Sequence, residues 1–195
     1  ASGALKYIQN SNLGGGGLVL LTSASDYDGA ATQFYATNIF SSTYDNYFVT
    51  GFIAPSSDAE IRFQWTTGGG TTAYTSADYN WNSSAYYVND SHGKAYQENG
   101  YHAESYIPIC VADIDSDADA SAGSFTFTIA DPATTLLSRA YIHGTSVFRN
   151  GGSAKLYGER FVGANESNVN ATGFKLYLSS GNLRDYSISV YGFKK

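Results

Sequence analysis

The chain is poor in residues that could cross-link it or give it redox chemistry. Its 195 residues include no Met, three Pro and a single Cys. Cys110 has no partner for an internal disulfide, so stability must come from the core and, in an oligomer, from subunit contacts. Because Cys110 lies in the apolar segment 107–111, we expect a buried small hydrophobe rather than a reactive thiol.

Charge and long apolar runs are also scarce. Only 14% of the residues are charged, the formal net charge is -6 and the isoelectric point is about 4.8. Such a balance repels phosphate backbones, so we expect no nucleic-acid partner. No segment approaches the roughly 18 to 20 apolar residues that a membrane span needs, and the start of the chain shows no signal-peptide pattern, so we expect no membrane partner.

What the chain has is β-forming sequence with turn residues. It is 43% hydrophobic and 15% aromatic, with 17 Tyr, 11 Phe and 21 Gly, which favours short strands in one globular domain. We expect residues 1–17 to be an N-terminal arm with a Gly-rich hinge and residues 18–195 to be a single β-sandwich domain. The arm either lies across a neighbouring subunit or frays as a terminus. The apolar run Leu18–Leu21 after the hinge predicts a buried strand.

The clearest strand pattern lies within residues 44–70. Ala59, Ile61, Phe63 and Trp65 share one face of segment 59–66, while polar side chains occupy the other, as in a half-buried strand. Segment 47–54 has large apolar residues on both faces, which indicates a more enclosed strand. The intervening segment 55–58, Pro-Ser-Ser-Asp, has turn chemistry, so we expect the two strands to form a hairpin.

Similar alternation recurs along the rest of the chain. The further strands that we expect lie within residues 32–40, 106–112, 124–128, 137–149, 154–161, 172–179 and 186–193. We interpret Gly144 as a bend in one of them. About ten antiparallel strands predict an all-β fold, a two-sheet β-sandwich of the jelly-roll type.

Residues 71–103 have a different texture, rich in aromatic and Asn residues and poor in aliphatic ones, and we expect a long excursion at one end of the sandwich. Aromatic faces with amide neighbours bind sugars or partner proteins. The candidate binding residues are Tyr74, Tyr79, Trp81, Tyr86 and Tyr87. The alternative is that these side chains only fill the outer face of the sandwich and pack on neighbouring chains.

Four carboxylates occupy alternate positions after residue 112: Asp113, Asp115, Asp117 and Asp119. Their oxygens suit a hard cation, so calcium is a candidate ligand. An EF-hand is excluded, because Ala118 and Ser124 stand at the sixth and twelfth places, where Gly and Glu are needed. The alternative, which the usual behaviour of acidic runs favours, is a solvated loop.

Catalytic motifs are missing from the sequence. His92, His102 and His143 are scattered, and there is no Gly-x-Ser-x-Gly element. Carboxylate pairs for glycoside hydrolysis cannot be singled out among 17 acidic residues. We therefore expect no enzyme, no catalytic residue and no cofactor other than the calcium considered above.

Two parts of the chain resemble a known group of proteins. One is Thr43-Tyr44-Asp45-Asn46-Tyr47 leading into a strand, with the turn and the strand that follow. The other is the closing part: residues 121–125 before a strand, Asp131-Pro132 after it, and above all the run from Phe174 to Leu183 followed by Ile188-Ser189-Val190-Tyr191-Gly192. Together they resemble small structural proteins of tailed phages of marine and freshwater bacteria, cyanophages especially.

The resemblance implies a non-enzymatic jelly-roll component of the virion, assembled in the host cytoplasm and exposed on the particle. A capsid decoration protein is the first expectation, a homotrimer in contact with the major capsid protein or with tail proteins. A short tail fibre or receptor-binding tip that contacts a host surface glycan is the second. A carbohydrate-binding module or lyase of a bacterium is the third. The resemblance carries over no catalytic residues.

Overall fold

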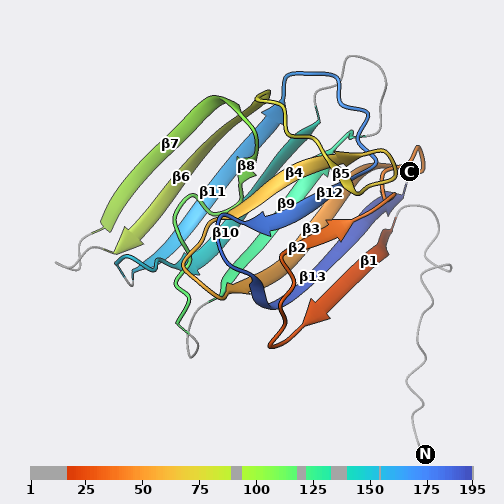
Figure 1. The fold of residues 1–195 in the computed structure, drawn as a ribbon. Coiled ribbons are helices and arrows are strands. Elements are labelled where there is room, and N and C mark those ends of the chain that lie inside the picture. Colours follow the sequence, from red (N-terminus) through yellow and green to blue (C-terminus); the bar gives the residue numbers. More distant parts are fainter. Residues whose placement is uncertain (1–16, 89–93, 118–121, 133–139, 154, 195) are drawn as a thin grey trace, which may run out of the picture.

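The computed structural model describes residues 17–88, 94–117, 122–132, 140–153 and 155–194. In these residues thirteen β-strands form two antiparallel sheets packed as a sandwich (Figure 1). The all-β fold with two sheets is therefore confirmed, whereas the jelly-roll wiring is not. The predicted arm, apart from Gly17, lies outside the described residues. No described segment is a helix long and apolar enough to cross a membrane.

The larger sheet has eight strands in the order β1-β13-β3-β9-β10-β11-β6-β7. Their bounds are Leu18–Asp26 (β1), Leu183–Lys194 (β13), Tyr44–Pro55 (β3), Gly123–Ala130 (β9), Tyr141–Arg149 (β10), Leu156–Asn165 (β11), Tyr79–Val88 (β6) and Lys94–Glu104 (β7). The smaller sheet has the order β2-β12-β4-β5, and β8 also pairs with β4. Its strands are Gln33–Ala36 (β2), Gly173–Leu178 (β12), Ile61–Thr67 (β4), Thr72–Ala73 (β5) and Ile107–Pro108 (β8).

The smaller sheet covers the middle of the larger one, and β1 and β7 lie at opposite edges (Figure 1). The larger sheet thus has an inner face, toward the smaller sheet, and an outer face. In the part of the chain that the structure describes, no layer covers the outer face. The outer sides of all eight strands, including β6, β10 and β11, therefore face away from the core.

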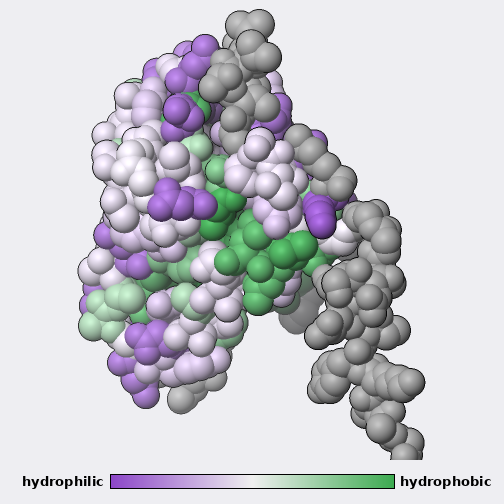
Figure 2. Space-filling view, turned by 90° about the vertical axis from the view of Figure 1, so that its right-hand side faces the viewer, coloured by the Kyte–Doolittle hydropathy of each residue, from purple (hydrophilic) through white to green (hydrophobic). Residues whose placement is uncertain are grey.

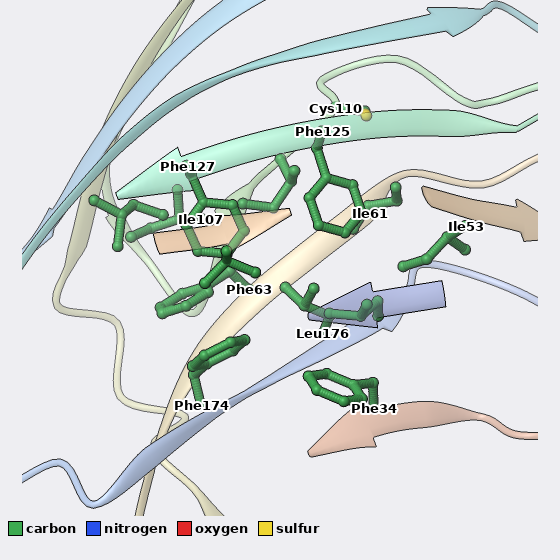
Figure 3. Packing of buried hydrophobic residues seen from close by; sticks show 14 of the residues in the cluster. Phe34, Ile53, Ile61, Phe63, Ile107, Cys110, Phe125, Phe127, Phe174 and Leu176 are labelled. Atoms are coloured by element: carbon green, nitrogen blue, oxygen red, sulfur yellow. The ribbon is translucent and has the colours of Figure 1, made fainter. Parts of the chain in front are cut away.

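The core is aromatic and lies between the two sheets. Figure 3 shows Phe125 and Phe127 of β9 pointing toward Phe63 of β4 and Phe174 of β12. The rings of Phe63 and Phe127 meet edge to face with centroids 6.0 Å apart, and those of Phe63 and Phe174 stack at 5.3 Å. Both geometries are favourable for aromatic pairs. The inward faces predicted for segments 59–66, 124–128 and 172–179 are therefore confirmed.

The predicted hairpin of residues 44–70 is wrong. Its strands β3 and β4 lie in different sheets, so segment 55–60 crosses from one sheet to the other instead of joining hydrogen-bonded neighbours. Ile53 and Ile61, on either side of this crossover, are both fully buried. The physical reason is that both strands have a strongly apolar face, and facing each other across the core buries both.

Residues 71–103 are more regular than the predicted excursion. They contain β6 and β7, strands of ten and eleven residues that pair antiparallel and widen the larger sheet. Small and polar residues suffice here because β7 is an edge strand with one hydrogen-bonded neighbour. The register shifts between Tyr79 and Trp81, and Ala103 takes a positive φ of 63° in the facing strand, which marks a bulge.

Gly144 is not a bend. It lies in unbroken register between Phe127 of β9 and Phe161 of β11. A Cβ at this position would meet the carbonyl oxygen of Thr126 and the backbone of Phe127. Glycine is therefore required here by close packing against β9, and β10 stays straight.

Candidate interaction surfaces

The five aromatic residues predicted to bind a ligand do not share one surface. Tyr79 is fully buried: its hydroxyl accepts a hydrogen bond from Trp65 N (3.0 Å) and donates one to Tyr74 O (2.9 Å). Burial raises the pKa of Tyr79 beyond the usual range for a phenol. Assigning Tyr79 to a binding surface was therefore wrong, because it is a core residue that fastens segment 72–74 to β4.

Three more members of the predicted set are half-buried and pack inward: Trp81 and Tyr87 on the inner side of the larger sheet, and Tyr74 just after β5 of the smaller sheet. Tyr74 donates a hydrogen bond to Asp78 Oδ2 at 2.6 Å. Trp81 lies beside Tyr101 of β7, with ring centroids 5.3 Å apart. Tyr87 stacks on Tyr157 at 4.6 Å. These rings pack inward against the protein's own core, so they fit neither the predicted ligand surface nor the alternative of an outer face that packs on neighbouring chains.

Tyr86 alone among the five stands on the outer face, and it is 59% exposed. Its ring centroid lies 5.0 Å from that of Tyr96 on β7, and the Tyr96 hydroxyl hydrogen-bonds to Glu98. Any contact of the predicted set with a large ligand would therefore be made from the outer face of β6.

The acidic run is tied to the sandwich by its backbone. Ile114 is buried and bridges to Ala59 and Asn150, while Asp115 faces Arg149, with Oδ2 3.4 Å from Nε. Asp115 Oδ1 accepts a hydrogen bond from the backbone N–H of Asp117 at 3.0 Å. These contacts attach residues 113–117 of the run to the sandwich.

In the described structure, the carboxylates of the acidic run do not gather into a set of metal ligands. Among the described residues, which include Asp113, Asp115 and Asp117, no three His, Cys, Asp or Glu side chains come together as metal ligands would. Asp119 lies outside the described residues. Calcium binding stays a prediction.

The outer face of β6, β10 and β11 carries two hollows that the sequence did not indicate. The first, of about 690 Å³, lies over Val162 of β11 and is bordered by Tyr141 and His143 of β10 and by Asn82 of β6. The second, of about 400 Å³, includes Tyr86, Val147, Leu156 and Gly158. Both hollows are mostly apolar, with exposed side chains on their rims.

One cation separates the two hollows. Arg160 of β11 lies in register with Thr145 of β10 on one side and with Ser84 of β6 on the other. It is exposed, and no described side chain forms an ion pair with it. The row of these three residues crosses the face midway between the hollows.

A second apolar surface lies at the opposite edge, on strand β1. Leu18 pairs in register with Phe193 and Leu20 with Tyr191, so all four side chains face outward together. Leu20 is 53% exposed, Phe193 44% and Leu18 38%. With Phe48, whose ring lies 6.3 Å from that of Tyr191, they form what we call the β1 patch.

The β1 patch corrects the prediction that residues 18–21 form a buried strand. The run is apolar on both faces, but β1 is an edge strand, and among the residues that the structure describes no layer covers its outer side. Figure 2, which views the molecule from this side, shows hydrophobic residues gathered between polar surfaces. An edge strand that remains unpartnered usually carries charges that discourage association, and β1 has only Asp26 at its end.

A buried acid in the sandwich interior was also missed from the sequence. Glu159 of β11 is 2% exposed and lies beside the buried Cys110 and Ser146. Burial raises the pKa of the Glu159 carboxyl to about 7 and raises the pKa of the Cys110 thiol as well. The buried state predicted for Cys110 is confirmed.

Comparison with known proteins adds no family to these observations. No protein-family model matches the chain, and no curated protein matches it in sequence. A function can therefore be inferred from the surfaces described above and from the resemblance of the opening and closing segments to phage structural proteins.

Proposed function

We propose that this protein is a non-enzymatic structural component of a bacteriophage particle, a decoration protein that assembles as a homotrimer on the particle surface. The observation that carries the proposal is the β1 patch. A monomer would leave Leu18, Leu20 and Phe193 in water on an edge strand that has one terminal charge. Exposed apolar patches of this kind mark protein contacts.

The occupant that we propose for the β1 patch is the same patch of two further copies of this chain. Three copies around a common axis would bury the same residues three times. The side chains in this contact are uncharged, and their burial has to outweigh the repulsion between chains of net charge -6. The trimeric number and the phage context come from the resemblance of the opening and closing segments, including Tyr191-Gly192. The same resemblance supports a jelly-roll topology for the sandwich.

The experiment for this proposal is cryo-electron microscopy of intact particles that contain the protein. Density at hexamer centres or three-fold positions of the head supports a decoration protein. Density only at the tail would replace it with the second candidate, a short tail fibre or receptor-binding tip. The hollows on the outer face favour that candidate, because a sugar of the host could occupy them.

Absence of the protein from purified particles would overturn both phage proposals. A monomer that binds polysaccharide would then favour the third candidate, a bacterial carbohydrate-binding module. If calcium binds at Asp113, Asp115, Asp117 and Asp119, it would act as a structural ion in all three candidate functions and would hold the acidic loop together. Calorimetry that detects no heat and no change in melting temperature with calcium would remove that role.

A further inference from the structure

We infer that the outer face of β6, β10 and β11 binds an oligosaccharide that carries an anionic group, with Arg160 as the residue that receives the anion. The inference goes beyond the proposed structural function and does not depend on trimer formation. It concerns a surface toward the opposite end of the larger sheet from the β1 patch, since four strands lie between β1 and β11 in the sheet order.

The charge distribution on this face favours an anionic ligand. Strands β6, β10 and β11 contain one carboxylate, that of Glu159, and it is buried. These strands contain two Arg residues: Arg149 forms an ion pair with Asp115, and Arg160 is exposed. In a chain of net charge -6, this face therefore offers an Arg with no outward-facing carboxylate on its own strand or on either adjacent strand to compete for it. Guanidinium groups bind carboxylate and sulfate through paired hydrogen bonds.

The strand register also places one outward carboxylate on β7, that of Glu98. It lies in register with Ser84, which in turn lies opposite Arg160. Glu98 is therefore two strands away from Arg160, about 10 Å at the usual spacing of neighbouring strands, and it hydrogen-bonds to Tyr96. An anion at Arg160 would be separated from this charge by the whole width of β6.

The shape of the face selects an oligosaccharide. The two hollows lie four residues apart along β11, from Gly158 to Val162, which is about 13 Å in a strand. Each has an exposed tyrosine ring, Tyr141 at 50% and Tyr86 at 59%, on which the apolar face of a sugar can pack. A chain of several sugar units could occupy both hollows and cross Arg160 between them.

The polar groups around the hollows match sugar hydroxyls. Asn82 and His143 border the first hollow, and the hydroxyls of Thr145 and Ser84 flank Arg160. Gly100 of β7 faces the Asn82 amide, where a Cβ would come within 3.2 Å of Nδ2. The glycine thus leaves this amide the room to lie along the rim, and a few neutral donors and acceptors on an apolar floor are typical of ligand sites.

The test is isothermal titration of the full chain with three oligomers of equal length: a galacturonic acid oligomer, a sulfated galactan oligomer and a neutral galactan oligomer. We expect at least one anionic oligomer to bind and the neutral one to bind about tenfold more weakly. The Arg160→Gln substitution should weaken binding of the anionic oligomer by about the same factor and leave the neutral oligomer unchanged. Tyr141→Ala should weaken both.

Lys194→Gln is the matched control, because it removes one exposed positive charge at the far edge of the same sheet. Amide NMR of the complex should show shifts confined to β6, β10 and β11, and circular dichroism should show that each variant folds. The inference is overturned if no oligomer binds, if Arg160→Gln binds like wild type, or if Lys194→Gln loses as much affinity as Arg160→Gln. Equal binding of a poly-glutamate peptide would also overturn it, in favour of an acidic protein partner.

Discussion

The carboxylate of Glu159 accepts a hydrogen bond from the backbone N–H of Val111, with Oε2 3.1 Å from the nitrogen, in the interior of the sandwich. This bond ties the segment after β8 to β11 and thereby closes one end of the core. It lowers the pKa of Glu159, but burial acts more strongly in the opposite direction, and the pKa is about 7. The protein therefore contains an acid that titrates near neutral pH without facing solvent.

We predict that stability falls as pH rises from about 4.5 to above 7. The folded state has the higher pKa, so it retains the proton of Glu159 in a range where the unfolded chain has lost it. The contribution is fully present below pH 4.5 and is lost as pH rises through 7. Urea unfolding at pH 5 and pH 8 measures the difference, which for this group alone is up to about 3 kcal/mol.

Glu159→Gln should flatten this dependence, because glutamine has the shape of the protonated acid and does not titrate. The variant should be more stable than wild type at pH 8 and no more stable at pH 5. Glu104→Gln, at the end of β7, is the control and should keep the wild-type slope. A slope that survives in Glu159→Gln would assign the pH dependence to another group.

Tyr79→Phe should lower the free energy of unfolding by about 2 kcal/mol. The substitution removes a hydroxyl that accepts a hydrogen bond from Trp65 N and donates one to Tyr74 O. The buried backbone N–H of Trp65 is then left without this partner. Urea unfolding with an unchanged dependence on denaturant concentration is the measurement. Tyr86→Phe, on the exposed outer face, should change stability by less than about 0.5 kcal/mol, and an equal loss in both variants would refute the account of Tyr79.

Gly144→Ala and Gly158→Ala should differ sharply although both positions lie in strands of the larger sheet. A Cβ at position 144 would meet the backbone of β9, so we expect a loss of about 1–3 kcal/mol. A Cβ at position 158 would meet nothing within 4 Å, and removing a glycine there should leave stability unchanged or slightly higher. Thermal unfolding of the two variants compares them directly, and similar melting temperatures would mean that close packing does not explain Gly144.

Strand positions and inward faces could be predicted from the sequence because a period of two is a local signal. The alternation of Phe125 and Phe127, for example, marks the core face wherever the strand lies in the sheet. The pairing of β3 with β13 and β9 instead of β4 could not be predicted, since Pro55 and its neighbours suit a hairpin and a crossover equally well. Exposure of Leu20 depends on β1 being an edge strand, which is a property of the whole topology.

The candidate surfaces were harder to predict than the fold. The hollows form where β6, β10 and β11 lie in register, so Tyr141 and Asn82 border the same hollow although they are 59 residues apart in the sequence. The core position of Tyr79 could not be predicted, because its neighbours in the sequence are polar. The burial of Glu159 could be predicted from the sequence, since this residue lies on the same face of its strand as the inward Tyr157 and Phe161. An acid at such a position indicates a buried carboxylate.

The central claim is that the protein works by association through the β1 patch, and analytical ultracentrifugation over a range of concentrations tests it most directly. We predict a species of three times the mass of one chain for wild type and a folded monomer for Leu20→Lys, which places a charge in the patch. Leu156→Lys changes a leucine that is even more exposed than Leu20 but lies far from β1, and this variant should remain trimeric. A wild-type protein that stays monomeric at every concentration, or a Leu20→Lys variant that assembles like wild type, would contradict the account.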